Sequence, residues 1–194
     1  MISPGAGEGG VATRARDALL RQWGLLVDAA PALDLDRPSR IEGWRNREVL
    51  AHLASQPLLL RHFLQTATSE SPGVTLAENL SGTVQLASVI NDAALEGARE
   101  ERVNLAASVQ AATPALLDAD LATTVTTFQG PILLADYLVT RCVEAVVHGR
   151  DLLPAVEPDA DALGITVEAL IAVLTQVQTS LVPEGPRATA AGLG

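Results

Sequence analysis

Apolar residues recur at spacings of three and four over most of the chain, which is the pattern of amphipathic α-helices. This periodicity predicts helices over residues 11–33, from residue 46 towards a loop at 69–75, and over 76–112, 132–153 and 159–182. One short stretch, which contains TTVTTF, favours β-structure and is interpreted as a connection or a small ribbon. The pattern therefore predicts an all-α bundle of four main helices plus a C-terminal helix.

Glycine, proline and capping residues indicate where these helices begin and end. Asn46 is placed to cap the second helix. Gly97 is the expected position of a break in the third helix. Pro131 is expected at the first position of the fourth helix, where its missing N–H costs nothing.

Composition supports one helical domain and limits its partners. Hydrophobic residues make up 48% of the 194 residues but aromatic residues only 3%, so the core is expected to consist of Ala, Leu and Val, which favours helices. The expected domain spans residues 11–182, between a flexible leader at 1–10 and a disordered tail at 183–194. The net charge of −10 argues against nucleic acid as a partner.

Cysteine usage and hydropathy indicate a cytoplasmic protein. Cys142 is the single cysteine, so no disulfide can form within the chain. The N-terminus lacks the pattern of a signal peptide, and no apolar run reaches the ~18 residues that span a bilayer. We therefore expect no membrane partner, whereas exposed apolar helix faces indicate a homodimer.

Four polar residues form a stripe along the fourth predicted helix, at steps of three, four and three. Arg141, Glu144, His148 and Asp151 therefore share one face of a helix that is otherwise apolar. Such a stripe ordinarily faces solvent. Because the apolar residues around it leave little other polar surface, an inward orientation is the alternative.

Glu144 and His148 lie one helical turn apart, close enough for a carboxylate oxygen and an imidazole nitrogen to bind the same metal ion. An ion pair between Glu144 and a protonated His148 explains this spacing equally well. His52 lies on the stripe that the second helix should bury, where it is either a third ligand or a hydrogen-bonded core histidine. His62 is rotated away from it and is expected at the surface, and Cys142 is expected to be a small buried hydrophobe.

Two segments carry a family resemblance. The sequences GWRNREVLAHLAS (residues 43–55) and TRCVEAVVHGRDLL (residues 140–153) resemble the signatures of DinB-like helical bundles, closest to the N-terminal domain of mycothiol-dependent maleylpyruvate isomerase. The resemblance covers most of the chain and implies a DinB-like up-and-down bundle. It also implies a divalent metal site formed by His52, Glu144 and His148, with zinc as the expected ion and nickel, manganese or iron as alternatives.

The resemblance further implies a reaction. A low-molecular-weight thiol such as mycothiol would bind the metal as a thiolate and attack an electrophilic small molecule, so the expected enzyme is a transferase or isomerase. Asp151 would orient an imidazole N–H, and Arg141 would pair with Glu144 or with an anionic substrate. Ion pairs at the helix surface are the other explanation for Arg141 and Asp151.

Two other functions need the same ligands. One is a non-catalytic bundle that binds metal or a small ligand, and the other is a metal-dependent hydrolase in which water replaces the thiol. The related isomerase continues into a second domain that helps to bind its substrate, whereas this sequence ends at Gly194. The resemblance therefore does not extend to maleylpyruvate as the substrate.

Overall fold

The computed structural model describes residues 8–99 and 104–181, so the predicted tail and most of the predicted leader lie outside these ranges. The first helix begins three residues before its predicted start at residue 11 and so includes residues 8–10, which the prediction assigned to the leader. The elements are α1 (Glu8–Ala29), the 3-10 turn η1 (Ala30–Ala32), α2 (Asn46–Leu64), α3 (Leu76–Gly82), the 3-10 turn η2 (Thr83–Leu86), α4 (Ala87–Arg99), α5 (Leu105–Asp118), β1 (Thr124–Thr127), β2 (Gly130–Leu133), α6 (Leu134–Asp151) and α7 (Ala160–Leu181).

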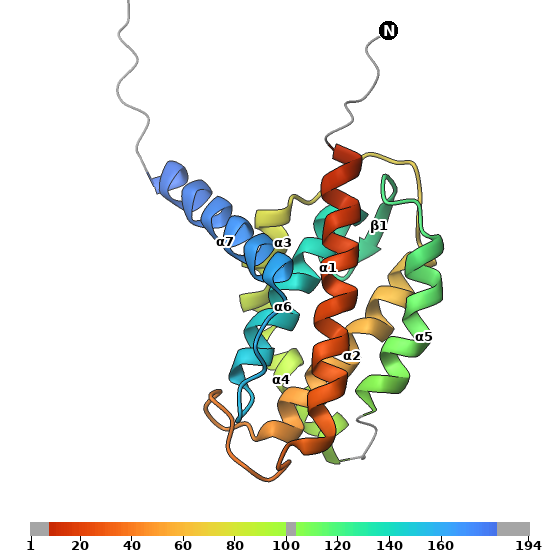
Figure 1. Ribbon diagram of the computed structural model, residues 1–194. Helices are drawn as coiled ribbons and strands as arrows, with labels where there is room; N and C mark the ends of the chain where they lie inside the picture. Colours follow the sequence, from red (N-terminus) through yellow and green to blue (C-terminus); the bar gives the residue numbers. More distant parts are fainter. Residues whose placement is uncertain (1–7, 100–103, 182–194) are drawn as a thin grey trace, which may run out of the picture.

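Four long helices, α1, α2, α5 and α6, form the bundle (Figure 1). α2 packs mainly against α5 and α4, whereas α1 packs mainly against α6. α7 contacts α1 and α6 and then extends beyond the bundle. This arrangement confirms the predicted all-α fold, in which a bundle of helices is followed by a C-terminal helix.

The core of the bundle consists of the apolar stripes of these helices. Leu19, Trp23 and Leu26 of α1, Leu53 of α2 and Leu138 of α6 are almost completely buried. Each large apolar side chain removed from water contributes about 1.5–3 kcal/mol. The stripes therefore decide which faces of α2 and α6 point into the molecule.

The segment that begins at Leu76 is not the single helix predicted for residues 76–112. It comprises α3, η2 and α4, and α5 begins after residues 100–103, which lie outside the described part of the chain. The side chain of Asn104 accepts a hydrogen bond from the N–H of Ala107 and so caps the start of a separate helix. The break expected near Gly97 thus falls close to the end of α4, whereas the earlier division between α3 and α4 was not predicted.

The TTVTTF stretch forms the first strand of a hairpin. β1 pairs with β2 in antiparallel register, with Thr126 opposite Pro131. Pro131 therefore lies in a strand, and the prediction that it opens the fourth helix is wrong, because α6 begins at Leu134. The N–H of Thr126 donates to the hydroxyl of Thr66, and the carbonyl oxygen of Pro131 accepts from the N–H groups of Gly73 and Val74. Thr126 and Pro131 are therefore a non-hydrogen-bonded pair, and the strand tolerates the proline because no acceptor in β1 requires its missing N–H.

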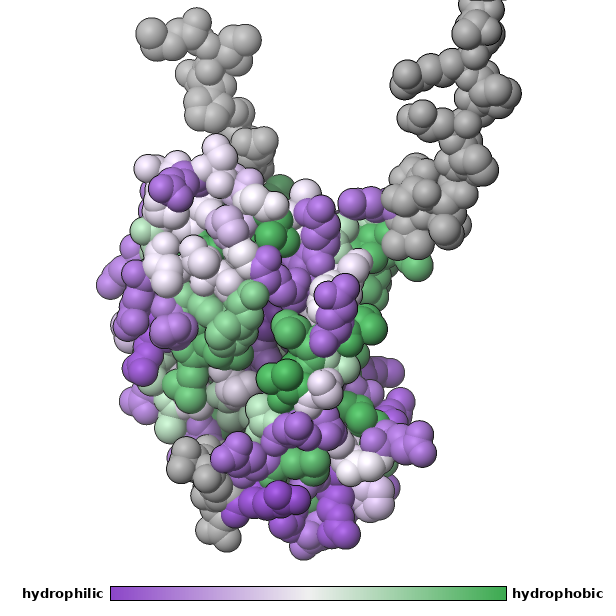
Figure 2. Space-filling view, turned by 180° about the vertical axis from the view of Figure 1, so that it is seen from behind, coloured by the Kyte–Doolittle hydropathy of each residue, from purple (hydrophilic) through white to green (hydrophobic). Residues whose placement is uncertain are grey.

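Apolar side chains also remain at the surface, where Figure 2 shows them as green patches on the face that carries α7 and the segment from α3 to α4. Val84, Val89, Ile171 and Leu174 are all more than half exposed. The predicted homodimer is not tested by these patches and stays a prediction. In the described part of the chain, every helix is too short or too polar to cross a membrane.

Asn46 has a different role from the predicted cap. Arg45 is the N-cap of α2, and Asn46 is the first residue of the helix. The buried amide of Asn46 donates to the carbonyl oxygens of Asp34 and Leu153 and accepts a hydrogen bond from the N–H of Leu153. Asn46 therefore ties the start of α2 to the segment that follows α6.

The substitution Asn46→Asp is expected to lower the free energy of unfolding by about 2–5 kcal/mol, because the carboxylate keeps the shape of the amide but cannot donate to either carbonyl oxygen and adds a buried charge. Urea unfolding followed by circular dichroism measures this loss. Asn104→Asp is the matched control, since Asn104 is exposed and Asp caps helices as well as Asn does. Equal losses in the two variants would contradict the proposed role of Asn46.

Candidate metal centre

The bundle brings His52 of α2 together with Glu144 and His148 of α6. The Nε2 atom of His52 lies 2.9 Å from Oε2 of Glu144, although 92 residues separate them in the sequence. The Nε2 atom of His148 lies 3.3 Å from the same oxygen. One ligand atom from each residue lies within 4.8 Å of the other two, so the three predicted ligands converge.

The polar stripe of α6 faces inward at this point. The side chain of His52 is 7% exposed, that of Glu144 is 12% exposed and that of His148 is 21% exposed. Arg141 and Asp151 are half-buried. The stripe is therefore not the solvent-facing surface that charged residues at helical spacing usually form.

Burial and hydrogen bonding set the charges of the three groups in the absence of a bound cation. Burial lowers the pKa of His52 more than its hydrogen bond to Glu144 raises it. Burial acts in the same direction on His148, but hydrogen bonds to Asp151 and Glu144 outweigh it and raise its pKa to about 9. Burial raises the pKa of Glu144, but hydrogen bonds from both histidines hold that pKa well below its usual range. His148 is therefore protonated between two carboxylates at neutral pH.

Two side chains compete for one nitrogen of His52. The Nε2 atom of His52 lies 2.9 Å from Oε2 of Glu144 and 3.3 Å from the side-chain amide nitrogen of Gln56. A single imidazole nitrogen cannot donate to the carboxylate and accept from the amide at the same time. A cation between His52, Glu144 and His148 would use the lone pairs of both imidazoles, so these residues fit a metal.

Asp151 contacts the outer nitrogen of one imidazole. Its Oδ2 atom lies 3.0 Å from Nδ1 of His148, while Nε2 of that histidine faces Glu144. A carboxylate in this position fixes the ring and directs the other nitrogen toward a metal. The contact that the predicted orienting role requires is present, and the role itself stays a prediction.

Trp44 covers the two histidines. The centre of its ring lies 5.9 Å from that of His52 and 6.5 Å from that of His148. Its indole N–H donates to Oδ1 of Asn91 on α4, 2.8 Å away, which fixes the ring over the imidazoles. Trp44 therefore connects the site to the segment that covers this side of the bundle.

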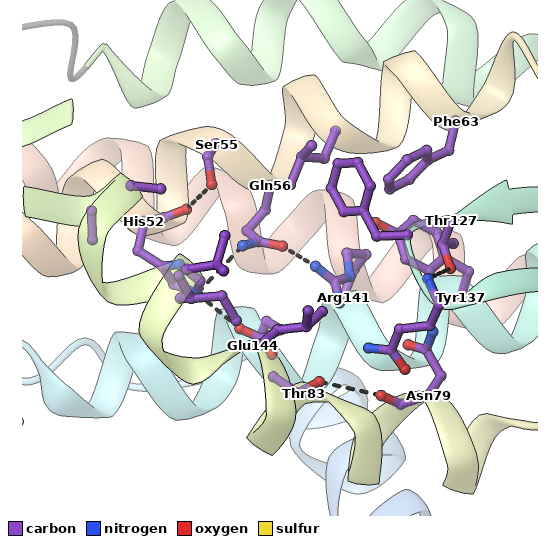
Figure 3. A pocket seen from close by; sticks show the side chains of 18 of the residues that line it. His52, Ser55, Gln56, Phe63, Asn79, Thr83, Thr127, Tyr137, Arg141 and Glu144 are labelled. Carbon is purple, nitrogen blue, oxygen red and sulfur yellow. Dashed lines mark hydrogen bonds and ion pairs between the residues drawn. The ribbon is translucent and has the colours of Figure 1, made fainter. Parts of the chain in front are cut away.

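Arg141 forms no ion pair with Glu144 within the described residues. Its guanidinium donates to the side-chain oxygen of Gln56 and lies 4.7 Å from the centre of the Tyr137 ring (Figure 3). Gln56 thus connects Arg141 to His52. No role for Gln56 or Tyr137 was predicted from the sequence, although Gln56 follows His52 by one helical turn.

Two hollows meet at this cluster. A cavity of about 480 Å³ is lined by residues of α2, α6, the segment from α3 to α4 and the hairpin (Figure 3). A second hollow of about 660 Å³ is lined by Trp44 and His148 among others. His52 and Glu144 line both. A small ion between these side chains is therefore accessible from two sides.

His62 and Cys142 lie away from the cluster, as predicted. His62 is exposed near the end of α2. Cys142 is completely buried, and burial raises the pKa of its thiol to about 12. The pKa of this thiol excludes a thiolate at neutral pH.

The described residues form a mainly helical bundle with one small hairpin. The sequence model of the mycothiol maleylpyruvate isomerase N-terminal domain matches residues 16–153, and the chain belongs to this family. Two solved structures are similar, one of the mycothiol-dependent maleylpyruvate isomerase and one of a mutant of that enzyme. Each is 23% identical, covers 88% of this chain and 69% of the other chain, and has a TM-score of 0.47. A comparison with curated proteins found no match.

In protein freed of metal by EDTA, His148 is expected to stay protonated at pH 8. Its pKa of about 9 lies above the usual ~6.5, so its pairing stabilises the fold fully below ~6.5, and this contribution is lost as pH rises through 9. Asp151→Asn should lower the pKa of His148, because it removes a carboxylate that is hydrogen-bonded to the imidazolium. NMR titration of the imidazole signals measures both values, and an unchanged pKa in the variant would contradict the assignment.

Proposed function

We propose that His52, Glu144 and His148 bind one divalent metal ion, with zinc as the first candidate. We further propose that the protein presents a low-molecular-weight thiol such as mycothiol to an electrophilic small molecule, as a transferase or isomerase of the cytoplasm. The convergence of three ligand atoms within 4.8 Å where two hollows meet carries this proposal. Membership of the mycothiol maleylpyruvate isomerase family supports the choice of thiol.

The charges of the ligands suit this chemistry. Two neutral imidazoles and one carboxylate leave a divalent ion with net positive charge and open coordination positions. When bound, the ion would lower the pKa of a thiol ligand and so supply a thiolate nucleophile at neutral pH. Nickel and manganese accept the same donors, so the identity of the ion depends on geometry and supply.

Neighbouring side chains set the protonation state and the orientation of the histidine ligands. His148 must lose its proton to become a ligand, and since its pKa is about 9, binding at pH 7 releases about one proton. Asp151 accepts the hydrogen bond of the remaining N–H at Nδ1 and keeps Nε2 directed inward. Trp44 packs against both imidazoles, and its apolar ring strengthens the electrostatic interactions beside it by lowering the local polarity.

A thiol fits the surroundings better than an attacking water does. Glu144 is the one carboxylate among the described residues that line the two hollows, and it is a proposed ligand. A hydrolase usually employs a further group that accepts the proton of water. A thiol, with an unperturbed pKa of about 8.5, loses its proton more readily. These surroundings favour the transferase or isomerase over the hydrolase.

Metal analysis of purified protein tests the ligands. After loading with zinc and dialysis, the wild type is expected to retain about one ion per chain. His148→Ala should weaken zinc binding by on the order of 100-fold or more, because it removes one of three protein ligands. His62→Ala is the matched control, since it removes an exposed histidine of α2 and should retain the ion. Undiminished zinc in His148→Ala would contradict the site.

Thiol consumption tests the reaction. Zinc-loaded protein is expected to accelerate the reaction of mycothiol with monobromobimane, and His52→Ala should lower kcat/KM by on the order of 100-fold. His62→Ala again serves as the control. A rate equal to the background with every physiological thiol would favour a non-catalytic binding bundle. Turnover of an activated ester by water alone would favour a hydrolase.

A further inference from the structure

The cavity of about 480 Å³ beside the candidate metal centre has mainly apolar walls. They include Leu59 and Phe63 of α2, Ile90 of α4 and Phe128 of the hairpin turn. Its volume lies in the range of cavities that bind small organic molecules, and such cavities combine apolar walls with a few polar groups that fix orientation. The walls therefore select a ligand with a substantial apolar part.

Arg141 is the one basic side chain, apart from His52, among the residues that line this cavity. Within the described residues Arg141 has no carboxylate partner at ion-pair distance. Its guanidinium contacts neutral groups, which include the side chain of Gln56 and the ring of Tyr137. A guanidinium carries five N–H donors in a planar fork that matches a carboxylate. An anionic ligand would therefore find a charged partner with donors to spare.

The order of the groups along the cavity sets the orientation of such a ligand. Figure 3 shows His52 and Glu144 at one side, Gln56 and Arg141 in the middle, and Phe63 and Tyr137 at the other side. Arg141 and Glu144 are three residues apart on α6, which places their Cβ atoms about 5–6 Å from each other. An anion on Arg141 thus lies within a few bond lengths of the candidate metal centre.

We propose that this cavity binds the electrophilic substrate, and that this substrate has an apolar body and one carboxylate that pairs with Arg141. Its reactive carbon lies near the carboxylate and faces His52 and Glu144, while the apolar body extends toward Phe63. The thiol enters from the second hollow, because the substrate occupies the first and both hollows reach His52 and Glu144. The assignment of the ligand as a substrate rests on the proposed function, whereas the binding specificity does not.

Calorimetry with an unreactive probe pair tests this specificity. The wild type, both zinc-loaded and EDTA-treated, is expected to bind 4-phenylbutyrate about tenfold or more tightly than the uncharged 4-phenylbutyramide. Arg141→Met should abolish this preference, and Arg141→Lys should retain part of it because it keeps the charge. Arg61→Met is the matched control, since it removes an exposed arginine of α2 and should leave the preference unchanged.

The outcomes separate this inference from the proposed function. Two outcomes would mean that the anion binds elsewhere, and either would overturn the inference. One is a preference for the carboxylate that survives Arg141→Met in folded protein, and the other is a preference that is present with zinc and absent without it. Mycothiol should change the affinity of zinc-loaded protein for 4-phenylbutyrate by no more than about twofold. If the two compounds displace each other, the cavity belongs to the thiol, and the inference is overturned. An Arg141-dependent preference in protein that fails to bind zinc would refute the proposed function and leave the specificity standing.

Discussion

The carboxylate of Glu144 lies inside a bundle built largely from Leu, Ala and Val, and the arrangement around it follows from this one buried charge. An uncompensated carboxylate in such surroundings costs several kcal/mol, so the fold must surround it with donors and positive charge. His52 and His148 provide the hydrogen bonds, and the charge of Arg141 acts in the same direction. A divalent cation would meet the same requirement with greater charge. The buried carboxylate of Glu144 therefore needs positive charge beside it for stability, and the proposed metal ion would supply that charge.

The space around this charge exists because one side of the bundle is covered by short elements. The buried residues of α4 are alanines, Ala94 and Ala98, and η2 has none. Small side chains fill little of the gap between this segment and α2, so a cavity of about 480 Å³ remains. The long helices thus hold the candidate ligands in place, while the segment from α3 to α4 shapes the space that a ligand can occupy.

Local signals in the sequence predicted the long helices well and the connections between them less well. Asn46 has the chemistry of a helix cap, but its amide binds Asp34 and Leu153, because the meeting of two distant loops offers it more hydrogen bonds than its own helix does. Pro131 has the chemistry of a first helical residue, yet it lies in a strand, where its carbonyl oxygen accepts from the N–H groups of Gly73 and Val74. In both cases a long-range contact prevailed over a local preference.

The sequence by itself determined most of the long helices and that Glu144 and His148 share one face, because periodicity and an i,i+4 spacing are properties of a single helix. The family resemblance added His52 to that pair. Tertiary structure decided that the face points inward and that Nε2 of His52 comes within 2.9 Å of Glu144. It also joined Gln56 to Arg141 and left a cavity beside them. Contacts between α2 and α6 depend on how all the apolar stripes pack at once, and no local pattern encodes that packing.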